Sequence, residues 1–134
     1  MNQKIKNILE KKNKSKIVSL TAYSKNIAKI LDNYCDIVLV GDSMANVLYG
    51  LKSTHKITIT NIIQHTLSVR KGVKKSLLVV DMPKGTYNNL KIAEKNAKLI
   101  TKITGCDAVK LESNNKNFKI IKNLVKKKIN VMGH

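Results

Sequence analysis

The sequence predicts an α/β fold built on a parallel β-sheet, and three observations support this fold class. Short apolar runs without alternation, such as Ile37–Val40 and the run within Ser76–Val80, are typical of strands that are buried on both faces. Segments with apolar residues at helical spacing separate these runs. Strand and helix patterns alternate along the chain, which favours parallel strands joined by crossover helices.

The first half of the chain shows this alternation after an initial helix. Its predicted elements are, in order, a helix within Asn2–Lys14, a strand within Lys16–Tyr23, a helix capped by Ser24, the strand Ile37–Val40 and a loop from Gly41 to about Ile59. A serine before an apolar-periodic stretch is a common helix cap. We expect the helix after Ser24 to bury Ile27, Ile30 and Leu31, because these residues share one face.

The second half continues the same pattern. Its predicted elements are a helix capped by Thr60 or Asn61 and ended at Gly72, the strand Ser76–Val80, a helix from about Asn88 to Thr104 stopped by Gly105, the strand Asp107–Leu111, a helix over Phe118–Val125 and a last strand within Ile129–His134. The predicted apolar stripes include Ile62, Ile63 and Leu67 in the first of these helices, and Phe118 and Val125 in the last.

This element order fits two architectures. One is an open doubly wound sheet, and the other is a (βα)8 barrel of the TIM type that holds only four βα units and a fifth strand. The chain contains neither GxGxxG nor GxxxxGK[ST], so the two commonest phosphate-binding loops are absent. No linker rich in proline or glycine divides the chain, and we expect a single domain over residues 1–134.

The charge balance needs an explanation, because 26 basic residues face 8 acidic ones and the net charge is +18. Such a charge can indicate nucleic-acid binding. However, Arg70 is the sole arginine, and aromatic residues for base stacking are scarce at 4%. We therefore disfavour nucleic acid as a partner, and interpret most lysines as solvated helix faces. A lysine-rich nucleic-acid-binding protein remains an alternative.

Cysteine usage and hydropathy predict a cytoplasmic protein. Cys35 and Cys106 are isolated, without the CxxC spacing of metal or redox sites, and reduced thiols are typical of the cytosol. The first residues lack the apolar region of a secretory signal. No apolar stretch approaches the roughly 18 residues of a membrane span, so we expect no membrane partner.

Carboxylates follow three successive predicted strands. Asp42, Asp81 and Glu112 are three of only eight acids, and each stands at the carboxyl end of a strand. Parallel α/β sheets place their chemistry at this edge, where adjacent acids repel one another unless a cation neutralises them. Oxygen ligands of this kind suit Mg²⁺. The pattern therefore predicts a metal site, although a single Asp at a strand end is often only a turn former.

Two further residues are candidates for substrate binding at the same edge. Lys110 precedes Glu112 by two positions and so points to the same side of an extended strand, where it can hold a substrate carboxylate. Ser43 follows Asp42 and can donate a hydrogen bond to an oxyanion. We interpret His65, on an apolar helix, as structural and His55 as a loop residue, while His134 ends the last strand.

These residues occur in motifs that resemble those of the ketopantoate hydroxymethyltransferase family. The matching motifs, which run through all 134 residues in order, are TAY (Thr21–Tyr23), VGDS (Val40–Ser43), Gly50, ST-x-x-x-T (Ser53–Thr58), HT-x-x-VR-x-G (His65–Gly72), D-x-P-x-G-x-Y (Asp81–Tyr87), VKLE (Val109–Glu112) and GH (Gly133–His134). Each motif is weak alone, and the combination is specific.

The resemblance implies a (βα)8 barrel that transfers a hydroxymethyl group from 5,10-methylenetetrahydrofolate to 3-methyl-2-oxobutanoate, giving 2-dehydropantoate for pantothenate synthesis. It implies Mg²⁺ bound by Asp42, Asp81 and Glu112. It also implies a keto-acid site formed by Asp42, Ser43, Asp81 and Lys110. The family is usually a homodecamer, so a homo-oligomer or a separate C-terminal half is expected as the protein partner.

The chain also departs from the family pattern. Lys84 replaces an aromatic residue after D-x-P, and Ser24 replaces an acid after TAY. The general base of the family is a glutamate on a later strand, beyond residue 134, so no catalytic residue is assigned within this chain. A (βα)8 barrel needs about 250 residues, and this chain corresponds to an N-terminal half. A truncated relic without catalysis is therefore the second alternative.

Overall fold

The structure is a computed structural model that describes residues 2–115 and 117–134. Its elements alternate as predicted, and most boundaries lie within two or three residues of the expected ones. In chain order they are α1 (Gln3–Glu10), β1 (Ser19–Thr21), α2 (Lys25–Leu31), β2 (Ile37–Val40), α3 (Met44–Val47), the 3₁₀ helix η1 (Thr54–Lys56), α4 (Ile59–Arg70), β3 (Leu77–Asp81), α5 (Leu90–Thr104), β4 (Ala108–Leu111), α6 (Phe118–Lys126) and β5 (Val131–Gly133).

The five strands form one parallel sheet in the order β1-β2-β3-β4-β5. A doubly wound sheet reverses its strand order at a switch point. Here each strand pairs with its neighbour in the chain and no reversal occurs, which is the arrangement of successive units in a barrel. The chain therefore folds as part of a (βα)8-type barrel, and the doubly wound alternative is wrong.

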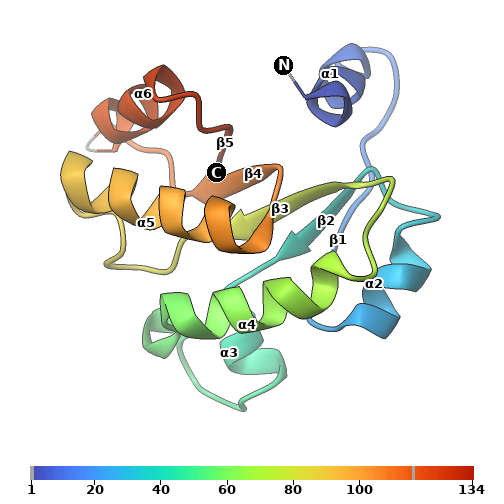
Figure 1. The fold of residues 1–134 in the computed structure, drawn as a ribbon, viewed down its shortest axis with the longest axis horizontal. Helices are drawn as coiled ribbons and strands as arrows, with labels where there is room; N and C mark the ends of the chain where they lie inside the picture. Colours follow the sequence, from blue (N-terminus) through green and yellow to red (C-terminus); the bar gives the residue numbers. More distant parts are fainter. Residues whose placement is uncertain (1, 116) are drawn as a thin grey trace.

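The main core lies between the outer face of the sheet and the helices α2, α4, α5 and α6 (Figure 1). Strand residues alternate between the two faces of a sheet. Val38, Val40, Leu78 and Val80 are fully buried against these helices. Small helix residues such as Ala28 allow a helix to approach the sheet closely. The buried residues of these helices are Ala28 in α2, then Ile62, Thr66 and Val69 in α4, and Ala93, Ala97, Ile100 and Thr104 in α5.

The inner face of the sheet carries a second, smaller apolar cluster formed by Ile37, Leu77, Val79 and Ala108. Helix α1 lies on this side, opposite to the other helices (Figure 1), and packs Ile5 and Ile8 against the cluster. Lys11 Nζ donates to Asp36 Oδ1 at 2.6 Å and Lys4 Nζ donates to the Ser76 carbonyl at 2.9 Å. These contacts fasten α1 across the amino ends of β2 and β3.

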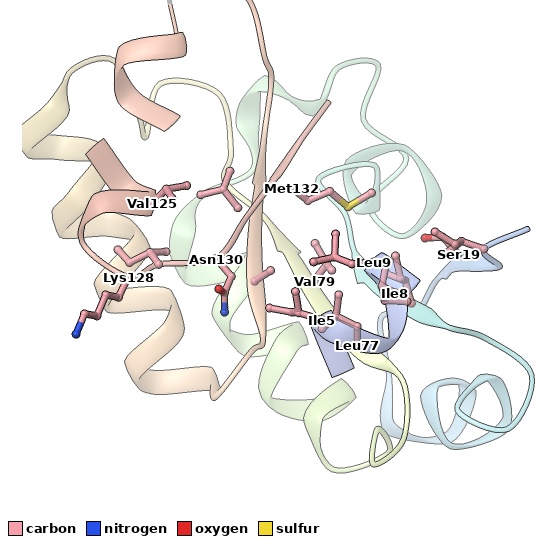
Figure 2. A pocket seen from close by; sticks show the side chains of 15 residues that line it. Ile5, Ile8, Leu9, Ser19, Leu77, Val79, Val125, Lys128, Asn130 and Met132 are labelled. Carbon is pink, nitrogen blue, oxygen red and sulfur yellow. The ribbon is translucent and has the colours of Figure 1, made fainter. Parts of the chain in front are cut away.

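Beyond α1 the inner face is open. An apolar cavity of about 690 Å³ lies there, and side chains from α1, β3 and β5 point toward one another around it (Figure 2). Within residues 2–115 and 117–134, the outer edges of β1 and β5 pair with no further strand. Ile17 and Val125 line this cavity and are 41% and 57% exposed, so the inner face of the half-barrel is incompletely covered.

Two expectations about the bounds of elements were wrong. The predicted loop after Gly41 contains α3 and η1. Helix α4 begins two or three residues earlier than expected, because Thr58 caps it by accepting from the Asn61 N–H while the Asn61 side chain accepts from the Thr58 N–H.

The predicted apolar faces were partly wrong as well. Ile27 and Ile30 of α2 are 50% and 58% exposed, whereas Ala28 is buried. Leu67, Phe118 and Val125 are also exposed. Helical periodicity identifies an apolar stripe but not its centre, and contact with the sheet selects the residues that are small enough to approach it. Cys35 and Cys106 are free cysteines, as expected. No helix among the described residues has the length and apolarity that crossing a membrane requires.

Candidate active site

The three predicted carboxylates lie at the carboxyl edge of adjacent strands. Asp81 is the last residue of β3, Glu112 directly follows β4, and Asp42 lies two residues beyond β2. All three line one cavity of about 230 Å³. The sheet therefore brings them to the same place, as the strand-end pattern predicted.

Asp81 is the most buried of the three, with 7% of the residue exposed. Its Oδ1 accepts from Lys110 Nζ at 2.8 Å, and its Oδ2 accepts from the Asp42 backbone N–H at 3.1 Å. Asp81 and Lys110 are direct partners in the register of β3 and β4, so the ladder itself sets up this ion pair. Lys110 thus compensates the buried charge of Asp81, because a carboxylate buried alone is costly.

Ser43 lies beside this ion pair at the start of α3. Its hydroxyl is hydrogen-bonded to the Tyr23 hydroxyl at 2.7 Å. Gly41 permits the tight turn, since a Cβ there would lie 3.0 Å from Ser43 Oγ and 3.3 Å from Asp81 Oδ2. The turn after β2 consequently packs directly against the carboxylate of β3. Of the predicted substrate-binding residues, Asp42, Asp81 and Lys110 line the cavity, whereas Ser43 lies next to it and is not a lining residue.

Tyr87 is a cavity residue to which the sequence analysis gave no role. It is buried, and burial raises the pKa of its hydroxyl, with further contributions from the negative charges of Glu112, Asp42 and Asp81. The field of all three acids thus reaches one hydroxyl, which supports their convergence. The signal was present in the D-x-P-x-G-x-Y motif, where Gly85 has a positive φ of 86° in the turn before Tyr87.

The rim of the cavity carries basic groups. Lys84 Nζ lies 3.0 Å from His55 Nε2, and both residues line the cavity together with His134. His55 belongs to η1 rather than to an irregular loop. Lys84 occupies the position at which the resemblance implies an aromatic residue, so a cation replaces an apolar surface at this rim.

A ready-made metal centre is not formed. In the two ranges that the structure describes, no group of three or more His, Cys, Asp or Glu side chains is arranged to hold a metal ion. Both oxygens of Asp81 already accept hydrogen bonds, and Glu112 is exposed. The assignment of Asp42, Asp81 and Glu112 as metal ligands therefore stays a prediction.

Comparison with known proteins identifies the family. The model of the ketopantoate hydroxymethyltransferase family matches residues 2–134. This chain belongs to that family. Within the ketopantoate hydroxymethyltransferase family, it is 61% identical over 134 residues to the 3-methyl-2-oxobutanoate hydroxymethyltransferase of Pelagibacter ubique. It is 48% identical over 119 residues to the enzyme of that name from Rhizobium etli, and 46% identical over 130 residues to that from Anaplasma marginale.

The chain spans about half the length of the curated hydroxymethyltransferases that it matches. The alignment with the Pelagibacter protein covers 100% of this chain but 52% of the relative, and the corresponding shares are 88% and 44% for the Rhizobium protein. The match lies in the N-terminal half of these relatives.

Solved structures support the fold independently. A phosphonopyruvate hydrolase in complex with oxalate and Mg²⁺ superposes with a TM-score of 0.73 at 9% identity, over 99% of this chain and 52% of that one. A 2,3-dimethylmalate lyase of the PEP mutase/isocitrate lyase superfamily gives 0.67 at 9% identity, with the same coverage. At this identity the likeness concerns the fold alone, and it again corresponds to half of each neighbour.

Proposed function

We propose that this chain is the N-terminal half-barrel of a 3-methyl-2-oxobutanoate hydroxymethyltransferase, and that it provides the keto-acid and divalent-metal site of that enzyme. One observation carries the proposal: Asp42, Asp81, Lys110 and Glu112, from three successive strands, line a single cavity in a member of this family. The reaction joins C3 of 3-methyl-2-oxobutanoate to the one-carbon unit of 5,10-methylenetetrahydrofolate, and the C3 proton must leave first.

The residues of this chain serve to bind and orient the keto acid. Lys110 offers an ammonium group that pairs with the substrate carboxylate, and Ser43 offers a hydroxyl to an adjacent oxygen. Tyr87, which also lines the cavity, contributes a neutral hydroxyl, because burial and the nearby acids oppose its ionisation. The base that removes the C3 proton belongs to the second half of the barrel.

The donor set fits Mg²⁺ in kind, because Asp42, Asp81 and Glu112 offer only hard carboxylate oxygens in one small cavity. When bound, Mg²⁺ supplies Lewis-acid polarisation of the keto acid, which acidifies C3–H. Asp81 would hold the metal with an oxygen that now accepts from Lys110 or from the Asp42 N–H. Lys110 would then be free to pair with the substrate carboxylate.

The enzyme needs a complementary half, by which we mean a segment or separate chain that corresponds to the second half of the relatives. It would pair with the open edges of β1 and β5 and cover the apolar inner face. Residues 1–134 are then a single structural domain that completes its core on assembly. A homo-oligomer of the completed barrel remains a prediction.

Reconstitution tests this function. The second half of the Pelagibacter relative is produced separately and mixed with this chain, Mg²⁺ and both substrates, and 2-dehydropantoate is measured. We expect product from the mixture only. Asp42→Asn, Glu112→Gln and Lys110→Met should each lower kcat/KM by about 100-fold or more, because each removes an interaction with metal or substrate.

A matched control distinguishes loss of the site from loss of assembly. Lys102→Met, on the exposed face of α5, removes a lysine in the same way as Lys110→Met and should leave activity unchanged. A soluble complex of the two halves that forms no product would refute the enzyme assignment and favour the relic.

The metal site has a test that needs no activity. Mn²⁺ substitutes for Mg²⁺ at oxygen sites and broadens nearby NMR signals. In the chain alone we expect broadening of Asp42, Asp81 and Glu112, which weakens in the Glu112→Gln variant. Broadening confined to Glu94 or Glu10, both outside the cavity, would contradict the assignment.

A further inference from the structure

His65 of α4 makes contacts that its place on an apolar helix did not predict. Its Nδ1 lies 2.9 Å from the Tyr23 carbonyl oxygen at the end of β1. Its Nε2 lies 2.9 Å from the Tyr49 hydroxyl in the segment after α3. Both tyrosine rings meet the imidazole edge-on, with centroid distances of 6.3 Å and 6.0 Å. The ring thus bridges the segments that follow β1 and α3.

The chemistry of these partners determines which nitrogen of His65 carries the proton. A backbone carbonyl can only accept a hydrogen bond, so Nδ1 must be the donor to Tyr23. In the neutral ring Nε2 is then the acceptor, and the Tyr49 hydroxyl can donate to it. The geometry therefore requires the Nδ1–H tautomer of the neutral ring, which the hydrogen bond to Tyr23 holds in place.

The same tyrosine reaches the candidate active site with its other end. The Tyr23 hydroxyl is hydrogen-bonded to Ser43 Oγ at 2.7 Å, and Ser43 lies next to Gly41 and the Asp81 carboxylate. His65 holds the backbone of Tyr23, and the side chain of Tyr23 holds Ser43. Two hydrogen bonds, joined through the covalent frame of Tyr23, thus connect α4, the segment after β1 and the turn after β2.

We propose that His65 is a positioning residue, which through Tyr23 fixes the hydroxyl of Ser43 at the substrate-binding edge. It does not touch the cavity itself. That Ser43 binds the keto acid rests on the proposed function. The link from His65 through Tyr23 to the turn after β2 does not rest on it. The test below therefore uses the chain alone and no enzymatic activity.

The test compares two substitutions of His65. His65→Asn places an amide N–H the same number of bonds from the backbone as Nδ1, and His65→Leu removes the donor. Amide hydrogen exchange reports on the turn after β2, where the Asp42 N–H donates to Asp81 and the Met44 N–H to the Gly41 carbonyl. We expect exchange of these two amides to be about fivefold faster in His65→Leu and nearly unchanged in His65→Asn.

This comparison separates positioning from general stability. Leucine is the better helix former, so a purely structural role in α4 would make His65→Leu the less damaging change. The Val109 amide, which donates to the Asn130 carbonyl on the far side of the sheet, serves as the internal control. Equal acceleration at Val109, or failure of asparagine to restore the turn, would overturn the proposal.

Two further measurements avoid dependence on how well the His65 variants fold. Ring ¹⁵N shifts of the unmodified chain should show the proton of neutral His65 on Nδ1, and an Nε2–H tautomer would refute the hydrogen bond to Tyr23. Tyr23→Phe keeps the carbonyl but removes the hydroxyl. It should loosen the Asp42 and Met44 amides while the His65 tautomer persists, and unchanged exchange at both amides would break the link to Ser43.

Discussion

At the scale of single residues, the charge of Asp81 is compensated by a lysine, which the strand-end pattern did not predict. The sequence suggested that neighbouring carboxylates at this edge require a cation, and Lys110 supplies one at 2.8 Å. The pair is largely buried, with side-chain exposures of 10% for Asp81 and 16% for Lys110. Charge compensation by Lys110 and by a metal ion are compatible, because three carboxylates line the cavity at this edge with two lysines, Lys84 and Lys110.

Asp32 is a buried carboxylate with a structural task. It accepts hydrogen bonds from the N–H groups of Lys74, Lys75 and Ser76, and so ties the end of α2 to the turn before β3. Burial alone would raise the pKa of Asp32, but these N–H donors outweigh burial and lower the pKa below its ordinary value of 3.8. The ionised form is therefore the one that stabilises the fold.

We predict that Asp32→Asn lowers the free energy of unfolding by about 2 kcal/mol at neutral pH. The amide oxygen is a weaker acceptor than the carboxylate, and the amide NH₂ group would face the backbone N–H donors. A carboxyl with a depressed folded pKa stabilises above its unfolded pKa and loses this contribution as pH falls through the folded pKa. The difference between the two proteins should thus shrink below pH 3.8 in urea titrations.

Glu10→Gln provides the matched control for this measurement. Glu10 is an exposed acid, 3.9 Å from Lys6, and the substitution should change the free energy of unfolding by less than about 0.5 kcal/mol. A constant difference between Asp32→Asn and the unmodified chain at every pH would contradict the ionic origin of the effect.

At the scale of elements, Gly72 is required by the packing of two helices and not by the local conformation of the chain. The sequence suggests a helix stop, and Gly72 does follow the C-cap Lys71 of α4. Unlike Gly105 with its φ of 62°, however, Gly72 is not among the glycines with positive φ. A Cβ at Gly72 would lie 2.4 Å from the Lys25 carbonyl oxygen and 2.8 Å from the Lys29 nitrogen. The glycine exists here because α2 and α4 approach each other closely.

We predict that Gly72→Ala lowers the free energy of unfolding by about 3 kcal/mol, since backbone atoms of α2 must move to admit the methyl group. Gly105→Ala is the control. It meets no atom within 4 Å and suffers only from its left-handed conformation, at a cost of about 1 kcal/mol. Urea unfolding of both variants measures the difference. Equal costs would show that α2 yields easily.

At the scale of the whole molecule, the apolar inner face of the sheet is only partly covered. Residues of all five strands line an apolar cavity of about 690 Å³, together with Ile5, Ile8 and Leu9 of α1 (Figure 2). Exposed apolar patches of this kind mark interaction surfaces. Helix α1 covers part of this face with Ile5 and Ile8, and the proposed complementary half would cover the rest.

We predict that the isolated chain binds an apolar fluorescent dye at this face. Val125→Glu and Ile17→Glu, at partly exposed positions of the cavity, should weaken dye binding and also association with the complementary half. Val47→Glu is the control, because Val47 is 68% exposed and lies outside the cavity. Fluorescence that falls equally for all three variants would place the dye elsewhere.

The sequence by itself determined the alternation of strands and helices, and with it the meeting of Asp42, Asp81 and Glu112 at one edge. Both follow from local periodicity, because every parallel strand delivers its last residues to the same side. Ile37–Val40 even has the predicted bounds.

Only the tertiary structure decided which residues far apart in the sequence contact one another. The pairing of Asp81 with Lys110 arises from the register between β3 and β4, and the reach of His65 to Tyr23 from the packing of α4 against α2 and β2. The burial of Ala28 in place of Ile27 depends on how closely α2 approaches its neighbours. These features depend on how the elements are placed relative to one another. Residue spacing within one element carries no information about that placement.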